Sequence, residues 1–364
     1  MIYMVIGTKA QFIKMAPIMV SLERRNIPYR IVSLSQHGSM GQDMLSAFDV
    51  ATDVVMPFER EQPVASIASG LVWMSKILLY TMLRPGFIRR EIFSKGRGIV
   101  LVHGDTMSAL LGLLLARRIG LPVGLVEAGL RSGKLFSPFP EELVRRLVER
   151  GCAMLFAPGD FEAKALMARF PEKVVKNTGY NTGRDALTLM VGNDEAEAGK
   201  GHPVVTLHRL ETLTNRRRLK RLIDVVVGVA EKAGKMRFVM HPPTEKALQK
   251  YGLLATVTSS PFIECQPLER YEVFARYLAA APFIMTDGGS IQEEASYLGK
   301  PCIVLRDQTE RAHGIGQTAR LTSWDVDEDW RFISDKINEV SMGSGLAAKL
   351  EASESIVDSL QVGD

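Results

Sequence analysis

The sequence has few cysteines and little excess charge of either sign. Cys152, Cys265 and Cys302 are odd in number, far apart and at no metal-ligand spacing, which favours a reducing cytoplasm over a disulfide framework. Lys and Arg number 45 against 41 Asp and Glu, a formal net charge of +4. The densest basic run, residues 215–221, is short and precedes an apolar stretch. We interpret it as a solvated helix face and expect no nucleic-acid partner.

We expect the start of the sequence to be a strand and not a signal peptide, and no long clean apolar run is present. The opening strand-like run, 2–6, has no basic region before it and no small-residue cleavage site. The nearest candidate for a membrane span, 64–87, is interrupted by Lys76, Arg84 and Pro85, whereas a span needs about 20 apolar residues. We expect a buried or amphipathic helix there. Peripheral docking on a bilayer stays open, through Trp73, Ile77, Leu78 and Tyr80.

What is present predicts two α/β domains. The chain has 364 residues, of which 46% are apolar, and at roughly 100–200 residues per domain this length predicts about two. Short apolar runs, each followed by a turn and a helical stretch, are typical of βαβ units. The expected strands are 2–6, 30–34, 99–103, 123–126 and 154–157, then 204–208, 237–241, 262–265, 283–287 and 302–306.

Gly, Asn and acidic residues are concentrated between these two series of strands. They occupy 178–185 and 192–201, and this composition favours exposed connections. The expected fold is α/β, with two Rossmann-like, doubly wound parallel-sheet domains that face a cleft. The predicted parts are domains 1–178 and 179–342, with a closing C-terminal helix in 343–364 that packs back on the first domain.

Polar residues follow the expected strands, where open parallel sheets bind their ligands. One such segment, 287–294, opens a helix with two glycines, so its N–H groups suit a diphosphate. Glu293 or Glu294 could accept hydrogen bonds from a ribose, or could merely complement the helix N-terminus. Neither Gly-x-Gly-x-x-Gly nor a P-loop sequence is present, which disfavours dinucleotide redox chemistry and P-loop ATP hydrolysis.

Three carboxylates, Asp105, Glu127 and Glu141, stand at or just beyond strand ends of the first half, and His208 occupies an equivalent place in the second. Clustered carboxylates push each other's pKa apart, which suits proton abstraction and return. Each also has a structural explanation: Asp105 precedes a capping threonine, Glu141 begins a helix, and Glu127 could pair with Arg131. Their joint placement favours catalysis.

Histidines complete the candidate set. His103 and His241 lack partners at metal-binding spacing, so we expect no metal and a supporting or substrate-contacting role for both.

Several motifs occur together in one order. They include Leu-Val-His-Gly-Asp-Thr at 101–106, Val-Glu-Ala-Gly-Leu-Arg-Ser-Gly at 126–133, Pro-Glu-Glu at 140–142, Thr-Asp-Gly-Gly-Ser-Ile-Gln-Glu-Glu-Ala at 286–295, and Leu-Arg-Asp-Gln-Thr-Glu-Arg at 305–311, with a weaker match in Gln36-His37. On the basis of these motifs, the chain resembles the UDP-N-acetylglucosamine 2-epimerase family. The resemblance implies a GT-B-type fold, a homodimer, no cofactor and a role in surface polysaccharide biosynthesis.

The resemblance also implies a reaction. UDP is eliminated across C1–C2 to give a 2-acetamidoglucal, and is re-added after reprotonation on the opposite face. By motif, Asp105, Glu127 and Glu141 are the acid/base carboxylates, and His208 helps the diphosphate leave. The implied substrate contacts are Lys9, Lys14, Arg131, Arg209, His241, Gly288, Gly289, Ser290, Glu294 and Arg311.

The chain departs from the family pattern at two phosphate-side loops. Residues 9–11 read Lys-Ala-Gln where most members have Arg-Pro-Glu, and 288–290 read Gly-Gly-Ser in place of Ser-Gly-Gly. Three alternatives stay open: a hydrolysing 2-epimerase that releases N-acetylmannosamine and UDP, a glycosyltransferase on the same scaffold, and a non-catalytic binding protein. The exact sugar and a regulatory UDP-sugar site also stay open.

Overall fold

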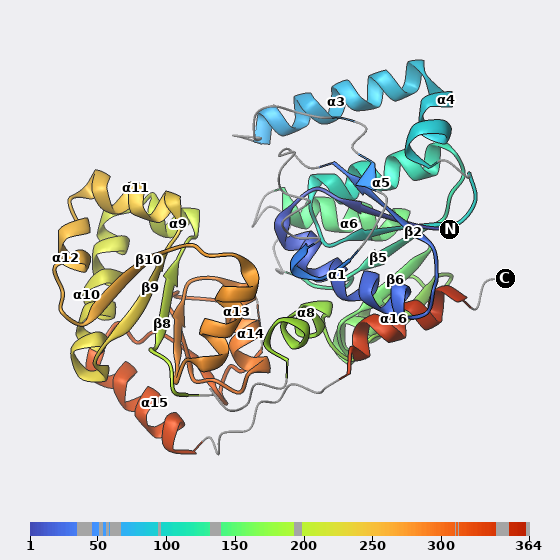
Figure 1. Cartoon of the computed structure of the whole chain (residues 1–364). Helices are drawn as coiled ribbons and strands as arrows, with labels where there is room; N and C mark the ends of the chain where they lie inside the picture. The colour runs from blue at the N-terminus through green and yellow to red at the C-terminus, as the bar shows by residue number, and fades with distance from the viewer. Residues whose placement is uncertain are drawn as a thin grey trace. The chain divides into compact units, whose positions relative to one another are not determined.

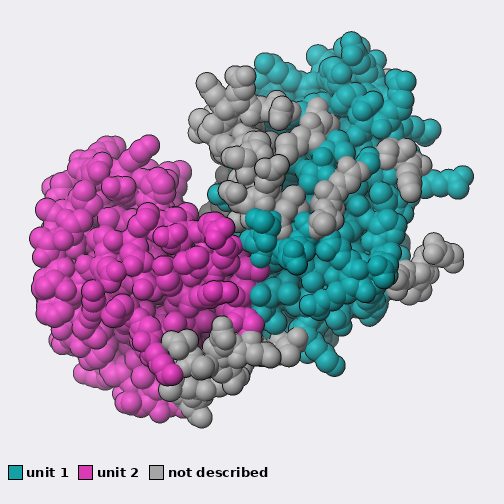
Figure 2. Space-filling model, in the orientation of Figure 1, with its two compact units in different colours: residues 1–189, 349–364 teal, residues 190–348 magenta. Residues whose placement is uncertain are grey.

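A computed structural model describes residues 1–34, 46–50, 54–55, 58, 67–93, 96–131, 140–192, 199–309, 311, 313–339 and 349–361. The chain forms two compact units, unit 1 (Met1–Leu189 with Lys349–Asp364) and unit 2 (Met190–Ala348) (Figure 2). Unit 1 therefore extends past the boundary expected near Thr178 and includes most of α8 (Thr182–Val191). The motif residues 36–37, 132–133 and 310 lie outside the described residues.

Unit 1 is built on a parallel sheet of seven described strands in the order β3-β2-β1-β4-β5-β6-β7 (Figure 1). The strands are β1 (Ile2–Ile6), β2 (Tyr29–Ser33), β3 (Val54–Val55), β4 (Ile99–His103), β5 (Val123–Val126), β6 (Met154–Ala157) and β7 (Val174–Asn177). Its helical elements are α1 (Lys9–Arg24), α3 (Ile67–Leu83), α4 (Pro85–Phe87), the π-helix η1 (Ile88–Ile92), α5 (Met107–Arg118), α6 (Glu141–Gly151), α7 (Asp160–Arg169), α8 and α16 (Glu351–Gln361). The strand order proceeds toward both edges of the sheet from the neighbouring central strands β1 and β4, which makes the sheet doubly wound.

Unit 2 repeats this plan with six described parallel strands in the order β10-β9-β8-β11-β12-β13. The strands are β8 (Val204–Leu207), β9 (Met236–Met240), β10 (Ile263–Pro267), β11 (Ile284–Thr286), β12 (Cys302–Val304) and β13 (Ala319–Leu321). The helices are α9 (Leu210–Leu213), α10 (Arg216–Ala233), α11 (Pro242–Tyr251), α12 (Leu254–Thr258), α13 (Tyr271–Ala280), α14 (Gly289–Tyr297) and α15 (Val326–Glu339). The predicted fold class, two parallel-sheet α/β domains, is confirmed.

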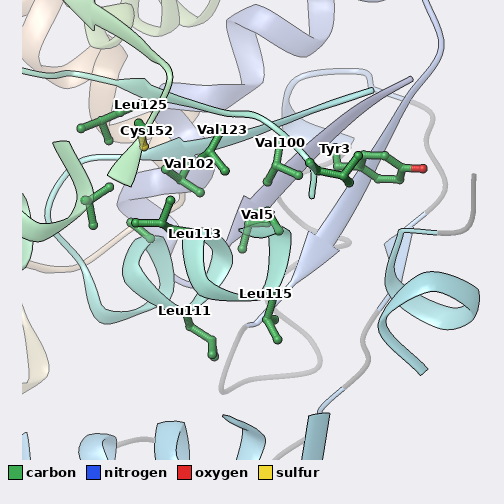
Figure 3. Packing of buried hydrophobic residues seen from close by; sticks show 14 of the residues in the cluster. Tyr3, Val5, Val100, Val102, Leu111, Leu113, Leu115, Val123, Leu125 and Cys152 are labelled. Atoms are coloured by element: carbon green, nitrogen blue, oxygen red, sulfur yellow. The ribbon is translucent and has the colours of Figure 1, made fainter. Parts of the chain in front are cut away.

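The central strands of unit 1 are mostly apolar because helices cover both faces of the sheet. All five residues of β1 are buried, as a parallel sheet requires. Leu113 of α5 points toward the strand side chains around Val5 and Val102, whereas Leu111 and Leu115 point away from the sheet (Figure 3). Gly112 makes this approach close, since a β-carbon there would stand 2.9 Å from Val5 Cγ1 and 3.0 Å from Val102 Cγ1.

The last helix, α16, packs on α1 within unit 1 (Figure 1). Asp358 pairs with Arg25 at the end of α1. Arg184 Nη1 lies 2.9 Å from Glu351 Oε2, and the Ser353 N–H donates to Asp185 Oδ2 at 2.7 Å. The C-terminal segment thus contributes to the unit in which the chain begins.

Helix α3 covers one side of unit 1 and leaves an apolar face uncovered. Ile77 is buried, while Val72, Leu79, Met82 and Leu83 are 56–75% exposed. Of the other side chains considered for bilayer docking, Trp73 and Leu78 are partly buried against the core and Tyr80 is exposed. Within the described residues, no helix combines the length and the apolar character that a membrane crossing needs.

Candidate functional site

The first candidate carboxylate, Asp105, stands in a tight turn at the carboxyl end of β4. Gly104 takes φ +66 there, a conformation that suits glycine. The Asp105 carboxylate is 27% exposed and forms an ion pair with Arg145 of α6. Arg145 also donates to Glu142 Oε2 at 2.8 Å, so the guanidinium is held between two carboxylates. Asp105 therefore keeps a cation beside it while one side faces solvent.

The second carboxylate, Glu127, follows β5 directly and is almost buried. Its φ of 63 is unusual for a residue with a side chain and costs roughly 1–3 kcal/mol, which the surroundings must offset. Its Oε2 accepts from Lys14 and from Asn181 Nδ2 at 2.6 Å, and lies 3.2 Å from His103 Nε2. A carboxylate with three such neighbours is held firmly in one place.

The third, Glu141, is the first residue of α6. Its Oε2 is buried and has no hydrogen-bond partner within the described part of the chain. A buried carboxylate oxygen without a partner is costly, so this atom suits a group that a substrate would supply.

Arg131 has a partner other than the one that the structural alternative for Glu127 suggested. It does not pair with Glu127: its Nη1 donates to Glu149 Oε1 at 2.7 Å and its Nη2 to the other oxygen of the same carboxylate. Glu149 is fully buried and also accepts from the Gly129 N–H at 2.9 Å. This bidentate pair ties the segment after β5 to α6. A substrate contact by Arg131 stays a prediction.

Two residues that hold these carboxylates were not predicted. Arg145 and Asn181 reach Asp105 and Glu127 from 40 and 54 residues away in sequence. Arg145 stands one helical turn after Glu141, at the spacing that places two side chains on one helix face. The spacing between Glu141 and Arg145 was therefore the feature of the sequence that could have identified Arg145 as a site residue. Of the predicted lysines, Lys14 contacts Glu127 and Lys9 is exposed in the first turn of α1.

In unit 2, a buried aspartate organises the end of β8. Asp287 Oδ1 accepts the His208 N–H at 2.9 Å and Oδ2 accepts the Arg209 N–H at 3.1 Å, at the start of α9. The imidazole of His208 stacks on that of His241, with centroids 4.9 Å apart and an interplanar angle of 27°. Asp287 thus fixes the backbone of two predicted site residues, and the stacked ring of a third lies beside them.

Burial changes the protonation of the stacked pair. It lowers the pKa of His208, against the opposing pull of the Asp287 carboxylate. Burial and then the neighbouring His208 lower the pKa of His241 to about 4. Both rings are therefore neutral in the unliganded protein near pH 7.

Helix α14 begins beside these rings. Gly288 is its N-cap, Gly289 is half-buried and Ser290 is exposed, so the first turn offers backbone N–H groups to an anion. Farther along, Tyr271 donates to Glu294 Oε1 at 3.1 Å.

The neighbouring carboxylate, Glu293, is already engaged. It is 3% exposed and accepts from Tyr297 at 2.9 Å and Arg311 at 3.1 Å. Glu294 is the more accessible of the two side chains, as a ribose contact would require.

The remaining predicted contact beside His208 is Arg209, whose Nε lies 2.7 Å from Glu211 Oε1. Within the described residues, no cluster of His, Cys, Asp and Glu could hold a metal ion.

Comparison with known proteins finds the same family over almost the whole chain. A family model described as UDP-N-acetylglucosamine 2-epimerase matches residues 21–355. The chain is 32% identical to the UDP-N-acetylglucosamine 2-epimerase of Bacillus subtilis, over 98% of this chain and 93% of that protein. It is 30% identical to the Methanocaldococcus jannaschii protein of the same name, with 89% and 88% covered.

Solved structures give the same result. The M. jannaschii structure in complex with UDP-GlcNAc and UDP superposes with a TM-score of 0.80 at 26% identity, covering 100% of this chain and 99% of that one. The Neisseria meningitidis structure bound to UDP-GlcNAc gives 0.79 at 27% identity, with both chains fully covered.

Proposed function

The chain belongs to the UDP-N-acetylglucosamine 2-epimerase family, and we propose that it interconverts UDP-N-acetylglucosamine and UDP-N-acetylmannosamine or a closely related UDP-N-acetylhexosamine. The observation that carries the proposal is the pair of strand-end carboxylates, Asp105 and Glu127, each held by a cation within unit 1. Two structural relatives are described as bound to UDP-GlcNAc, which supports the same substrate here.

The proposed chemistry divides between proton transfer and departure of UDP. A base removes the C2 proton while the C1–O bond breaks, and the acetamidoglucal is then reprotonated at C2 from the other face as UDP returns to C1. Glu141, whose Oε2 lacks a protein partner within the described residues, suits a proton acceptor. Asp105 and Glu127, held beside Arg145 and Lys14, are the other proposed acid/base carboxylates, and one of them supplies the proton that is added to C2 on the opposite face.

Unit 2 is proposed to bind UDP. The N–H groups at the start of α14, from Gly288 to Ser290, suit the diphosphate, with Arg209 and His241 nearby. His208 assists departure of the diphosphate, and Glu294 accepts from the ribose. Lys9, Lys14, Arg131 and Arg311 complete the proposed substrate contacts.

We further propose that the protein is a cytoplasmic homodimer. The exposed apolar face of α3 is the kind of surface that a second copy covers. Lys76 and Arg84 are exposed beside this face, so contact with an anionic bilayer is the alternative. The cysteines, all free, suit a reducing compartment.

Proton NMR in heavy water tests the function directly. We expect purified protein with UDP-N-acetylglucosamine to exchange the C2 proton for deuterium and to form UDP-N-acetylmannosamine. Exchange with release of UDP and N-acetylmannosamine would identify the hydrolysing reaction instead. Sugar transfer to an acceptor without C2 exchange would identify a glycosyltransferase. Binding of UDP without exchange in any UDP-N-acetylhexosamine would contradict the epimerase function.

A further inference from the structure

The carboxylate of Asp287 lies beside the imidazole of His208, in the unit that is proposed to bind UDP. Asp287 is fully buried, and its Oδ1 stands 3.6 Å from Nδ1 of His208. That nitrogen is also buried and has no hydrogen-bond partner within the described part of the chain. A separation of 3.6 Å is too long for a hydrogen bond, but catalytic contacts are often long in a protein without substrate and shorten when it binds. A small rotation of the ring would therefore pair the two groups.

The backbone at the ends of two strands holds this carboxylate in place. β8 and β11 are neighbours, with Thr206 opposite Thr286, so the residues that follow them come side by side. Asp287 Oδ1 accepts the His208 N–H at 2.9 Å, and Oδ2 accepts the next N–H, of Arg209, at 3.1 Å. Because a carboxylate oxygen can accept two hydrogen bonds, Oδ1 keeps one acceptor position for the imidazole.

The position of this charge decides which nitrogen of the His208 ring carries the proton. A neutral imidazole has one N–H and one bare nitrogen, and a carboxylate near Nδ1 favours the proton there. Nε2 lies toward the N-cap of α14, since a β-carbon on Gly288 would stand 2.9 Å from it. A second proton then binds at Nε2, on the side where the start of α14 is proposed to bind the diphosphate.

Three other titratable groups lie close to the His208 ring. His241 stacks on it with centroids 4.9 Å apart, and Arg209 and Glu211 are paired with each other at 2.7 Å. Burial has the largest effect and lowers the pKa of His208. Among the charges, Asp287 has the largest effect and raises this pKa, Arg209 lowers it, and Glu211 raises it less. Asp287 is therefore the main group that favours the protonated ring.

We propose that Asp287 is a positioning residue for His208: its carboxylate keeps Nδ1 protonated and turns Nε2 toward the diphosphate site, so that the protonated ring donates to the departing UDP. The inference rests on the proposed epimerase function and adds to it a residue that does not touch the substrate. With its proton on Nε2 instead, the neutral ring would place a bare Nδ1 against the carboxylate oxygen, and two acceptors would then face each other.

One substitution and one matched control separate this role from simple stabilisation. Asp287→Asn keeps the size of the side chain and removes its charge. Asp329→Asn makes the same change at another fully buried aspartate of unit 2, which accepts the Ser323 N–H at 3.0 Å and the Thr322 hydroxyl at 2.6 Å. We expect both variants to lower Tm, because each replaces an acceptor oxygen by an amide nitrogen that cannot accept.

NMR of histidine side chains labelled with a nitrogen isotope reads the tautomer without turnover, and His208→Gln identifies the signal. We expect Nδ1–H in the wild-type protein. In Asp287→Asn the pKa of His208 should fall, because the opposite charge is gone, and Asp329→Asn should leave it unchanged.

The pH dependence of turnover provides the second measurement. The kcat for C2 exchange should fall on the order of 100-fold at pH 8 in Asp287→Asn, as loss of a positioned proton donor does. The loss should be smaller at pH 6, where more of the rings are protonated. Asp329→Asn should keep the wild-type kcat at both pH values.

Three results would overturn the proposal. The first is the Nε2–H tautomer of His208 in the wild-type protein, a result that needs neither a variant nor turnover. The second is a pKa of His208 in Asp287→Asn equal to that in wild type. The third is a loss of kcat that Asp329→Asn shares at both pH values. A wild-type protein without C2 exchange would refute the epimerase function, and the NMR titration would still decide whether Asp287 orients His208.

Discussion

A β-carbon on Gly288 would stand 2.3 Å from Cε1 of His208 and 2.9 Å from its Nε2. The α14 N-cap and the imidazole therefore occupy adjoining space, and the imidazole can stay there only because residue 288 has no side chain. The same absence lets the first turn of α14 and the ring of a proposed leaving-group partner lie side by side.

Gly288→Ala should displace His208 and lower kcat for C2 exchange by about tenfold or more. Overpacking of this kind also costs about 1–3 kcal/mol of folding stability. Urea denaturation and the NMR exchange assay measure the two effects. Ser259→Ala, at an exposed position of unit 2, is the control and should change neither. An active Gly288→Ala protein would show that His208 is not needed where it stands.

Binding of UDP should be accompanied by proton uptake near pH 6. Burial lowers the pKa of His208 and, together with His208, that of His241 to about 4, so before binding His241 is neutral there and His208 is less protonated than an exposed histidine. A diphosphate beside them favours the charged imidazolium and raises the pKa. Calorimetry in buffers of different ionisation enthalpy should show the uptake in wild type and less of it in His208→Gln. A binding enthalpy independent of buffer would contradict this arrangement.

Asn181→Asp should impair the site more than Asn181→Ala. The aspartate would place a second carboxylate where an amide now donates to Glu127 Oε2 at 2.6 Å, and like charges this close repel strongly. We expect kcat at pH 8 to fall on the order of 100-fold in Asn181→Asp and to recover partly at lower pH, where one carboxylate is protonated. Asn181→Ala should show a smaller loss without that recovery. Equal pH profiles for the two variants would refute this interpretation.

Asp185→Asn should stabilise the protein above pH 6. Burial raises the pKa of the Asp185 carboxyl to about 6, although hydrogen bonds from Ser353 oppose this. A raised native pKa means that the stability is complete below the unfolded value near 4 and is lost as pH rises through 6. The loss is about 3 kcal/mol at most, and Asn avoids it while still accepting from the Ser353 N–H.

Thermal unfolding from pH 4 to 8 measures this prediction. The gain in Tm from Asp185→Asn should grow between pH 4 and 6 and then stay constant. A gain that is the same at every pH would show that ionisation of Asp185 is not its cause.

If α3 forms the interface of the proposed homodimer, Leu83→Asp should give a monomer, because it puts a charge on the apolar face of α3, where Leu83 is 75% exposed. Light scattering after gel filtration should give half the wild-type mass. Lys76→Gln, on the same exposed side, should keep it. If wild type is monomeric and floats with anionic vesicles while Leu83→Asp does not, the face binds bilayers and the homodimer is wrong.

The sequence predicted the central strands well because their apolar runs are continuous. The predicted ranges 2–6, 99–103, 123–126 and 154–157 coincide with β1, β4, β5 and β6. The missed strands are β3, β7 and β13, and they lie at sheet edges. β7 alternates exposed and half-buried residues, since an edge strand has fewer neighbours to bury it, and β3 has two residues.

Site residues were predictable where they end a strand, because the carboxyl edge of a parallel sheet is a general ligand site. Asp105 and Glu127 met this condition. Their partners did not, since Arg145 and Asn181 come from helix and loop positions that only the tertiary fold brings near. The structural alternative for Glu127, a pair with Arg131, does not occur, for a related reason. No helix joins the two, and Arg131 instead meets Glu149 of α6.

The return of α16 to α1 makes unit 1 a discontinuous domain, with all of unit 2 inserted into it. During synthesis, α1 and the seven-stranded sheet emerge from the ribosome long before the residues that cover Asp185. Unit 2 can complete its fold while the chain is still growing, but unit 1 cannot close until translation has reached its last helix. A premature stop within the final fifteen residues would therefore damage the half of the protein that was made first.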